Sequence, residues 1–389
     1  MPPRNSAAVD LLLELLSIPG KSGEEGEVAK FIVERLRKAG VPDSAVSFDQ
    51  ANRHSPIGGQ VGNLIVKLPG SVKGPRRLLM AHIDTVPLCV GAKPVRKGNT
   101  ISSADPTTAL GGDDRSGATV ILNTILTLLE EDLPHPPLTL MWAVQEEIGL
   151  VGARYVTASK LGSPKMCFNW DGGAANVATI GATGAFHLEI TVRGKAAHAG
   201  AHPEDGVSAI AIASMAISDL VANGWHGLIV KGKKTGTSNI GVIRGGAATN
   251  VVTDRVDLEA EARSHDPAFR QKIVEAIIAA FAKAAKSLRS ASGERGQVEF
   301  DIQDKYESFR LDKKELSVAT AVDAIHRRGL EPDLRISNGG LDANWMTAHG
   351  FPTVTLGCGQ SGIHTTAETL DLDQFEHACE IALDLATTN

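Results

Sequence analysis

Histidines and acidic residues follow several short apolar runs of this 389-residue sequence, at the point where each run ends. Two imidazoles with several carboxylates and no neighbouring thiolate form a ligand set that suits zinc, manganese or cobalt in a catalytic site. Such ions polarise carbonyl groups and provide a nucleophilic water at neutral pH. The residues concerned are His82 and Asp84 after Leu78–Ala81, Glu146 and Glu147 after Leu138–Val144, Asp171 after Lys165–Trp170, and His364 after Thr353–Leu356.

Two spacings within this set indicate a division of roles. His82 and Asp84 are two residues apart, so on a strand they share a face, and Asp84 can accept the second ring N–H of His82. Glu146 and Glu147 are adjacent, so their side chains diverge. One of them can bind metal while the other acts as general base on a metal-bound water.

Each of these residues also has an ordinary structural interpretation. A histidine after a strand is more often a loop residue than a ligand, and an Asp-Gly-Gly sequence is ordinarily a turn. The acidic pair Asp113 and Asp114, in the loop Leu110–Gly117, can stabilise the start of a helix through its dipole. The joint occurrence of such residues after four separate strands favours the metal site over these alternatives.

The first and last parts of the chain must position these residues, and both have an α/β pattern. In an open α/β sheet, ligands bind beyond the carboxyl ends of the strands. If the apolar runs are neighbouring strands, their ends bring the histidines and carboxylates to one crevice. We expect helices at 6–16, 24–39, 117–130, 315–328 and 373–386, and strands at 63–68, 78–83, 138–144, 165–170 and 353–356.

The pattern changes near residue 182 and returns near residue 309. Between them, alternating runs and helical runs follow one another in the order β-α-β-β-α-β, which is typical of a ferredoxin-like module. We expect a small domain over 182–308, inserted into an α/β domain formed by 1–181 and 309–389. The expected strands are 186–192, 238–242, 255–263 and 297–303, and the expected helices are 207–221 and 269–288.

Composition excludes several other classes of protein. A net charge of −6 without a long basic run argues against a partner that is a nucleic acid or an anionic membrane. Four scattered cysteines without a C-x-x-C pair argue against a zinc finger, an iron–sulfur site or a disulfide framework. No apolar stretch approaches the roughly 18 residues of a membrane span, and the N-terminal apolar run carries Asp10 and Glu14, unlike a signal peptide. We therefore expect a cytoplasmic protein.

Nine sequence segments, taken in order, resemble those of the M20 family of dinuclear zinc peptidases, and the peptidase T-like (tripeptidase) branch fits best. Five lie in the larger domain, three resemble the family's lid or dimerisation domain, and Gly339–Asn344 resembles the substrate loop of the peptidase T-like branch. The five are H-x-D-T-V at 82–86, G-D-D-R-S-G at 112–117, Q-E-E-x-G at 145–149, W-D-G-G at 170–173 and G-I-H-T-T-A-E at 362–368. The three are K-A-A-H-A-G at 195–200, G-G-A-A-T-N-V-V at 245–252 and E-A-R-S-H-D at 261–266.

The resemblance implies a zinc-peptidase catalytic domain with a mixed sheet flanked by helices, and an inserted ferredoxin-like lid. It also implies two Zn²⁺ ions per chain, with Mn²⁺ or Co²⁺ as possible alternatives. Glu146 is then the general base toward a water that bridges the metals, and Asp84 orients His82. The implied metal ligands are His82 and Asp171 for one ion, Glu147 and His364 for the other, and Asp113 for both.

Residues of the inserted domain and of the substrate loop are implied to bind the substrate. His198 helps to polarise the substrate carbonyl, Asn250 and Arg263 hold a substrate carboxylate, and Gly340 lies in the substrate loop. The alternative for Arg263 is an ion pair with Glu261 or Asp266. A homodimer through the lid is also implied, in which His198 acts on the site of the other subunit. The alternatives are that His198 acts within its own chain, or only packs beside neighbouring alanines.

The implied function is metal-dependent hydrolysis of short peptides that have a free C-terminal carboxylate, as by a tripeptidase or another exopeptidase. Two other functions stay open from the residues. One is an M20-type carboxypeptidase or N-acyl-amino-acid amidohydrolase, which shares the site and differs in substrate. The other is a non-catalytic metal- or peptide-binding module, against which the intact Glu146 stands because a binding module has no need of a general base.

Overall fold

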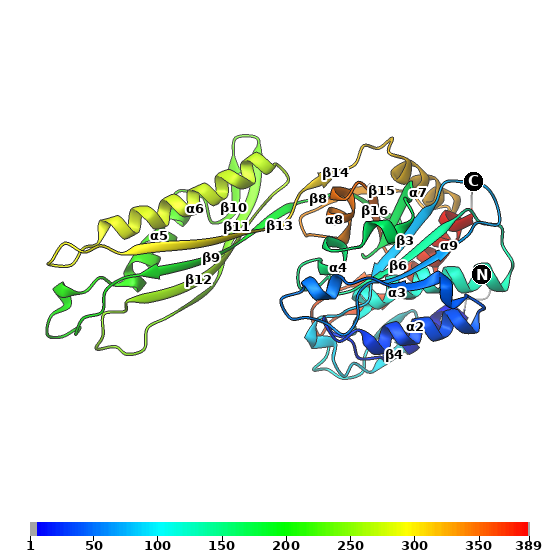
Figure 1. Cartoon of the computed structure of the whole chain (residues 1–389), viewed down its shortest axis with the longest axis horizontal. Coiled ribbons are helices and arrows are strands. Elements are labelled where there is room, and N and C mark those ends of the chain that lie inside the picture. Colours follow the sequence, from blue (N-terminus) through cyan, green and yellow to red (C-terminus); the bar gives the residue numbers. More distant parts are fainter. Residues whose placement is uncertain (1–5, 388–389) are drawn as a thin grey trace. The chain divides into compact units, whose positions relative to one another are not determined.

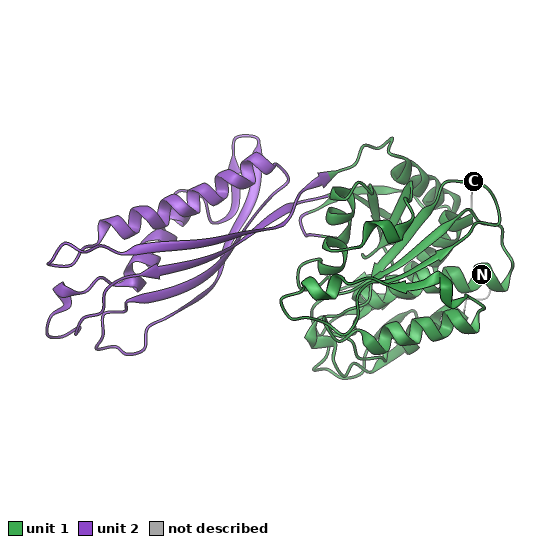
Figure 2. Cartoon of the chain, in the orientation of Figure 1, with its two compact units in different colours: residues 1–181, 310–337, 341–389 green, residues 182–309, 338–340 purple. Residues whose placement is uncertain are grey.

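The computed structural model describes residues 6–387, which form two compact units (Figure 2). Unit 1 comprises the chain up to Gly181, the segment Arg310–Ser337 and the chain from Leu341 onward. Unit 2 comprises Ala182–Phe309 and the short segment Asn338–Gly340. Unit 2 is therefore an insertion in the chain of unit 1, joined by three residues from a later loop.

Unit 1 is built on a mixed sheet with nine strands in the described part of the chain (Figure 1). At its centre β6 (Leu138–Ala143), β3 (Arg77–His82), β7 (Met166–Trp170) and β16 (Thr353–Leu356) lie side by side and run parallel. Every residue of these four strands is buried, as expected where helices cover both faces of a parallel sheet. The flanking strands are β1 (Val46–Phe48) and β2 (Leu64–Leu68) beyond β6, and β8 (Val177–Ala182), β14 (Phe309–Arg310) and β15 (Asp333–Ser337) beyond β16.

Helices pack on both faces of this sheet. They are α1 (Ser6–Leu16), α2 (Gly26–Lys38), α3 (Gly112–Glu130), α4 (Val151–Arg154), α7 (Leu316–Arg327), α8 (Asp342–Ala348) and α9 (Leu372–Thr387). On one face α3 contacts β3 and β7 and packs against α1 and α9, and Trp142 donates its indole N–H to the carbonyl of Ala118 in α3 at 3.1 Å. Met141 points to the opposite face, where it joins a buried cluster with Met80, Ala153 of α4 and Met346 of α8.

A second, antiparallel sheet of unit 1 lies beside the N-terminus of α3. In the described chain it has four strands in the order β17-β18-β5-β4. The loop between β17 and β18 carries His364 and Glu368, so this sheet, which the sequence did not predict, fixes the position of both. Its strands are β4 (Pro94–Lys97), β5 (Thr100–Ser103), β17 (Gln360–Ser361) and β18 (Thr369–Asp371).

Unit 2, all of which is described, has an antiparallel sheet in the order β10-β11-β12-β9-β13. Its two helices pack against the inward-facing side chains of the strands and form one buried cluster with them. Ser208 caps α5, and Asp266 caps α6 with a proline in the next position, so both helices begin where their sequences favour a start. The elements are β9 (Gly184–Arg193), α5 (Ala209–Ala222), β10 (Gly227–Lys231), β11 (Lys234–Gly245), β12 (Arg255–Ser264), α6 (Pro267–Ser287) and β13 (Gln297–Tyr306).

The expected α/β class, with a mixed sheet flanked by helices, is confirmed, and each helix expected from the sequence is present. One helix begins at Gly112 and not at Gly117, so Asp113 and Asp114 lie in its first turn. Unit 2 differs from the expected six-element order by one strand, β10, which adds an edge next to β11. Within residues 6–387, we find no helix with the length and apolarity needed to cross a bilayer.

Candidate metal centre

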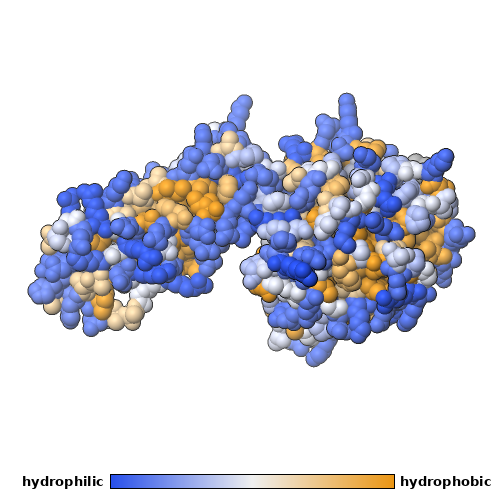
Figure 3. All heavy atoms as spheres, viewed as in Figure 1, coloured by the Kyte–Doolittle hydropathy of each residue, from blue (hydrophilic) through white to orange (hydrophobic). Residues whose placement is uncertain are grey.

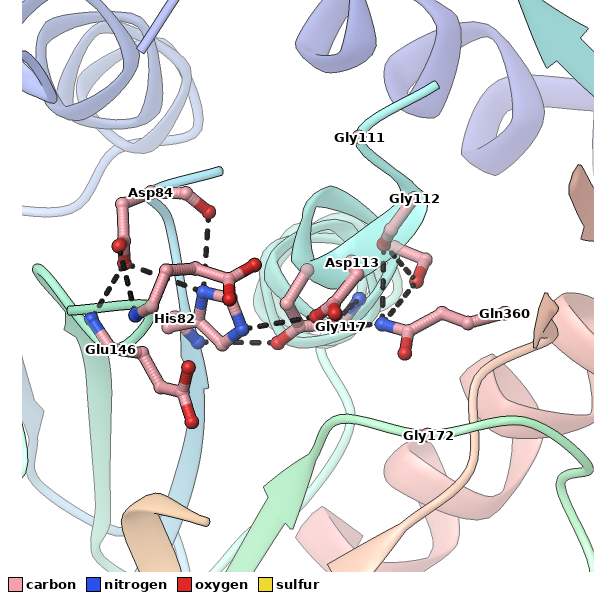
Figure 4. A network of polar contacts seen from close by, with 12 residues as sticks. His82, Asp84, Gly111, Gly112, Asp113, Gly117, Glu146, Gly172 and Gln360 are labelled. Atoms are coloured by element: carbon pink, nitrogen blue, oxygen red, sulfur yellow. Dashed lines mark hydrogen bonds and ion pairs between the residues drawn. The ribbon is translucent and has the colours of Figure 1, made fainter. Parts of the chain in front are cut away.

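His82 is the last residue of β3, and its ring lies between two carboxylates (Figure 4). Its Nδ1 lies 3.4 Å from Oδ1 of Asp84, and its Nε2 lies 3.2 Å from Oδ1 of Asp113. The Asp84 carboxylate is fully buried, as is nearly all of the His82 ring. A proton on Nδ1, directed at Asp84, leaves the Nε2 lone pair directed at the cluster, which is the orientation that a metal-binding histidine requires.

Asp113 occupies the centre of the cluster. Its Oδ1 faces Nε2 of His82, and its Oδ2 lies 3.1 Å from Nε2 of His364. Asp113 belongs to two groups of side chains whose ligand atoms all lie within 4.8 Å of one another, one with His82 and Asp171 and one with Glu147 and His364. The structure therefore brings all five predicted ligand residues together, with the Asp113 carboxylate shared between the two groups.

Asp114, the neighbour of Asp113, has a different environment. Its Oδ2 accepts the backbone N–H of His82 at 3.2 Å, and its Oδ1 accepts hydrogen bonds from the backbone N–H of Gly117 and from Nε2 of Gln360. All of these groups are buried. Asp114 is thus engaged with the scaffold that supports His82, and it belongs to neither ligand group.

Glu146 and Glu147 follow β6, and Asp84 holds the backbone of both. The backbone N–H of Glu146 donates to Oδ1 of Asp84 at 2.9 Å, and that of Glu147 donates to Oδ2 at 3.2 Å. The side chain of Glu147 reaches His364, with Oε2 at 2.9 Å from Nε2. The carboxylate of Glu146 belongs to neither ligand group, so the two adjacent side chains diverge as the sequence predicts.

Several buried carboxylates lie close together in the cluster, and their pKa values are shifted from the ordinary range. Burial raises the pKa of Glu147 to about 7, and burial together with the neighbouring Asp113 raises the pKa of Asp171 to about 7. Burial also raises the pKa of Glu146 well above its ordinary value. Burial acts in the same direction on Asp113, but hydrogen bonds from His364 and His82 lower its pKa below the ordinary range.

This donor set fits a pair of divalent cations. Two imidazoles and three carboxylates form two groups that share one carboxylate, and neither group contains a thiolate. Buried carboxylates repel one another, and cations between them would stabilise their charged forms. The donor chemistry accommodates zinc and equally manganese or cobalt. A site of this kind, with a further carboxylate beside it, is typical of a metal-dependent hydrolase.

The family model described as peptidase family M20/M25/M40 matches residues 78–388, and the chain belongs to this family. The resemblance inferred from the motifs is thereby confirmed, as is the assignment of the chain as a metallopeptidase and not a non-catalytic binding module.

Relatives and solved structures support the same placement. An uncharacterised protein of Bacillus subtilis, YqjE, is 33% identical over 372 residues, which are 95% of each chain. A peptidase T of Geobacillus kaustophilus is 23% identical and covers 94% of this chain and 92% of its own. A tripeptidase from Staphylococcus aureus has a TM-score of 0.88 with 31% identity, and aminopeptidase PepT from Bacillus cereus has a TM-score of 0.85 with 32% identity. Each structure covers 99% of this chain and 98% of its own.

The other predicted residues, His198, Asn250, Arg263 and Gly340, all lie in unit 2. Nδ1 of His198 accepts the backbone N–H groups of Gly200 and Ala201, at 3.2 and 3.1 Å. Asn250 is exposed. A Cβ on Gly340 would lie 2.3 Å from the ring of Tyr306, so this position requires glycine because of a close approach.

Arg263 lies in a pocket of about 550 Å³ within unit 2 and forms an ion pair there. Its Nη2 lies 2.8 Å from Oε2 of Glu261, while its buried Nε has no hydrogen-bond partner. The pairing with Glu261 that the sequence left open is therefore present. The second alternative partner, Asp266, instead contacts Lys234 and caps α6.

Sequence reasoning missed several residues that support the cluster. Ser22 donates its hydroxyl to Oδ2 of Asp84 at 2.7 Å, and Glu25 accepts the backbone N–H of Gln145 at 3.2 Å. Gln360 donates to Asp114, and Glu368 accepts three backbone N–H groups near Asp113. Only Glu368 carried a local signal, because it ends the motif that contains His364.

Proposed function

We propose that this chain is an exopeptidase that hydrolyses short peptides, of the tripeptidase type. The observation that carries the proposal is the shared position of Asp113 between two ligand groups, with Glu146 beside both and outside each. The relatives named peptidase T and tripeptidase support the choice of short peptides as substrates. The further structural neighbours of 15–19% identity, which include a dipeptidase and an amidase, show the fold alone.

The residues that would hold two metal ions are the five of the cluster. His82 and Asp171 would bind one ion, Glu147 and His364 the other, and Asp113 both. When bound, the ions supply a Lewis acid for the scissile carbonyl and a nucleophile derived from water at neutral pH. Zinc is the ion that we propose, with manganese and cobalt as alternatives, because nitrogen and oxygen donors accept all three.

Glu146 is the proposed general base. Its backbone N–H is held by the buried carboxylate of Asp84, which also faces the ring of His82. Burial, and then the neighbouring carboxylates Asp171, Asp342 and Glu147, raise the pKa of its side chain, and the positive charge of bound cations would keep the carboxylate ionised. A carboxylate of this basicity takes a proton from the attacking water and returns it to the departing amine.

His198 is the proposed donor to the substrate carbonyl. Two backbone N–H groups donate to its Nδ1, so the proton of the neutral ring resides on Nε2. An Nε2–H group can donate to a carbonyl oxygen as negative charge builds on it. The assignment rests on the motif resemblance and on this tautomer.

Arg263 is the proposed contact for the C-terminal carboxylate of the substrate, with Asn250 and Gly340 as further substrate-binding residues. The guanidinium lies in a pocket whose lining includes Glu261 and His265, and its Nε is free of hydrogen-bond partners within unit 2. A guanidinium that donates two parallel hydrogen bonds matches the geometry of a carboxylate. The ion pair with Glu261 would have to open, or to be shared, when substrate binds.

Unit 1 is the proposed catalytic domain and unit 2 the proposed lid, through which two chains form a homodimer. Apolar side chains gather on the visible face of unit 2 (Figure 3), and β10 is an edge strand with Leu228 and Val230 exposed. Met215 and Val221 of α5 are exposed as well. An open edge and exposed apolar residues on one unit suit pairing with a second copy of the same chain.

The alternative is an M20-type carboxypeptidase or N-acyl-amino-acid amidohydrolase. A digest of a library of di-, tri- and tetrapeptides, with N-acetylated and C-amidated copies, tests the choice when products are identified by mass spectrometry. Release of the N-terminal residue from free tripeptides, with N-acetylated copies intact, is the expected result. Release of the C-terminal residue, or cleavage of N-acetyl amino acids alone, would contradict the tripeptidase assignment.

A further inference from the structure

A buried carboxylate outside the ligand set, that of Glu368, is bonded to the loop that carries Asp113. Its Oε2 accepts the backbone N–H groups of Leu110 and Gly111, each at 2.8 Å, and its Oε1 accepts that of Asp113 at 3.0 Å. Only 2% of Glu368 is exposed. Three main-chain donors from three of four consecutive residues thus converge on one side chain.

This loop has an irregular backbone that needs support from outside. Gly111 has φ +83° in the left-handed region. Asp113 (φ −83°, ψ 102°) and Asp114 (φ −123°, ψ 40°) depart from helical geometry although they lie in the first turn of α3. Regular helical hydrogen bonding therefore does not fix the position of Asp113. The hydrogen bonds to the Glu368 carboxylate hold the backbone at this position instead.

Glu368 also belongs to the loop that carries His364, whose ring contacts Asp113. It lies four residues after His364, between β17 and β18, and its backbone N–H donates to the carbonyl of Thr365 at 3.1 Å. His364 Nε2 in turn lies 3.1 Å from Oδ2 of Asp113. The side chain of Glu368 thus connects the loop of one ligand to the loop of another.

We propose that Glu368 is a positioning residue that fixes Asp113 relative to His364, so that both ligand groups are formed before metal binds. The inference rests on the proposed metal site. Partners that orient metal ligands typically change metal affinity by 10- to 100-fold when they are removed. A carboxylate is required because two oxygens must accept three N–H donors, and a negative charge at the start of α3 is favoured by the helix dipole.

The test replaces Glu368 with glutamine, which keeps the size of the side chain. The amide presents an NH₂ group in place of one oxygen, so at least one of the three backbone N–H groups loses its acceptor. Metal-free wild type and Glu368→Gln are titrated with Co²⁺ and followed by visible absorption, together with kcat and KM on a tripeptide. We expect Co²⁺ affinity 10- to 100-fold weaker and a lower kcat at saturating metal, with KM nearly unchanged.

Asp49→Asn is the matched control. Asp49 is a buried carboxylate of unit 1 that also accepts several donors, the backbone N–H groups of Ala51, Asn63 and Thr157 and the side chain of Asn63. None of these partners is a proposed ligand. This variant should lose thermal stability and keep its Co²⁺ affinity, because a structural role alone does not change the ligand geometry.

A second variant, Gly112→Ala, guards against misfolding of Glu368→Gln. A Cβ at residue 112 would lie 3.2 Å from Oε1 of Glu368, so it displaces the Glu368 carboxylate slightly from its three N–H donors without a change of charge. A smaller loss of Co²⁺ affinity in the same direction is expected. Wild-type affinity and kcat in both variants, or an equal loss in Asp49→Asn, would overturn the inference. Wild-type protein that binds no Co²⁺ would instead contradict the proposed function.

Discussion

Asp84 accepts the backbone N–H of Glu146 at 2.9 Å, and this contact joins two parts of the proposed chemistry. The same carboxylate lies 3.4 Å from Nδ1 of His82 and accepts the hydroxyl of Ser22. One fully buried side chain therefore orients a proposed metal ligand and the loop of the proposed general base together. The relationship gives Asp84 a second role besides the orientation of His82 that the sequence predicts.

Replacement of Glu146 by glutamine should separate metal binding from catalysis. The side chain belongs to neither ligand group, so both ions should remain bound. Turnover should fall about 10²- to 10⁴-fold, the usual contribution of general acid–base catalysis. Steady-state kinetics on a tripeptide, with metal content measured on the same sample, checks this. A kcat equal to that of wild type would place the base elsewhere.

Replacement of Arg263 by alanine should slow the hydrolysis of peptides that have a free C-terminal carboxylate. A charge-assisted, two-bond contact contributes roughly 1.5–3 kcal/mol, so kcat/KM should fall about tenfold to a hundredfold for the acid and little for the C-terminal amide. Arg255→Ala is the control, because Arg255 forms a similar ion pair with Asp257 on the same strand. Equal losses of kcat/KM for the acid and the amide would indicate that Arg263 only forms its ion pair with Glu261 and does not bind the substrate carboxylate.

Mixed dimers should show whether His198 acts on the other subunit. His198→Ala and Glu146→Ala chains, each inactive alone, are refolded together, and dimers with one chain of each kind are isolated. If the site is shared, one of the two centres contains both intact residues, and activity returns to about half of the wild-type value. Verified mixed dimers without activity would mean that His198 acts within its own chain. If His198 has only a packing role, His198→Ala stays active by itself.

The five residues that the sequence proposes as ligands lie together in the structure, because the information that places them is local. Buried runs such as Leu78–Ala81 end directly before His82, and parallel strands bring their carboxyl ends to one edge of the sheet. The choice between Glu146 and Glu147 came from family resemblance, since adjacency alone shows only that the two diverge.

The supporting contacts could not be predicted in the same way. Glu368 receives N–H groups from residues more than 250 positions earlier, and no local pattern indicates such partners. The two residues of β17 are too few to show an alternation. Strand β10 was missed because it has apolar residues on both faces and so shows no alternation in the sequence. Leu228 and Val230 are exposed on one face, and Ile229 is buried on the other.

Glu25 should make stability depend on pH. Burial, and then the nearby Asp84, raise its pKa from the ordinary 4.5 to about 7. Between these values the folded chain keeps a proton that the unfolded chain releases, so the free energy of unfolding falls as the pH rises. Glu25→Gln keeps an oxygen for the N–H groups of Gly23 and Gln145 and cannot ionise. The free energy of unfolding of Glu25→Gln, relative to that of wild type, should increase by about 3 kcal/mol from pH 4.5 to pH 7.5.

Urea unfolding of metal-free protein at several pH values measures this difference. Glu34→Gln, at an exposed position of α2, the helix that follows Glu25, reports the general effect of losing one acidic side chain. A difference between Glu25→Gln and wild type that does not change with pH would show that Glu25 titrates normally in the folded chain.

A metal titration shows whether Asp113 joins two metal sites that together hydrolyse short peptides. Protein freed of metal with a chelator is titrated with Zn²⁺, while bound zinc and tripeptide hydrolysis are measured in parallel. We expect no activity without metal, full activity near two ions per chain, and loss of both ions in Asp113→Ala. Full activity in metal-free protein, or two ions still bound by Asp113→Ala, would contradict this expectation.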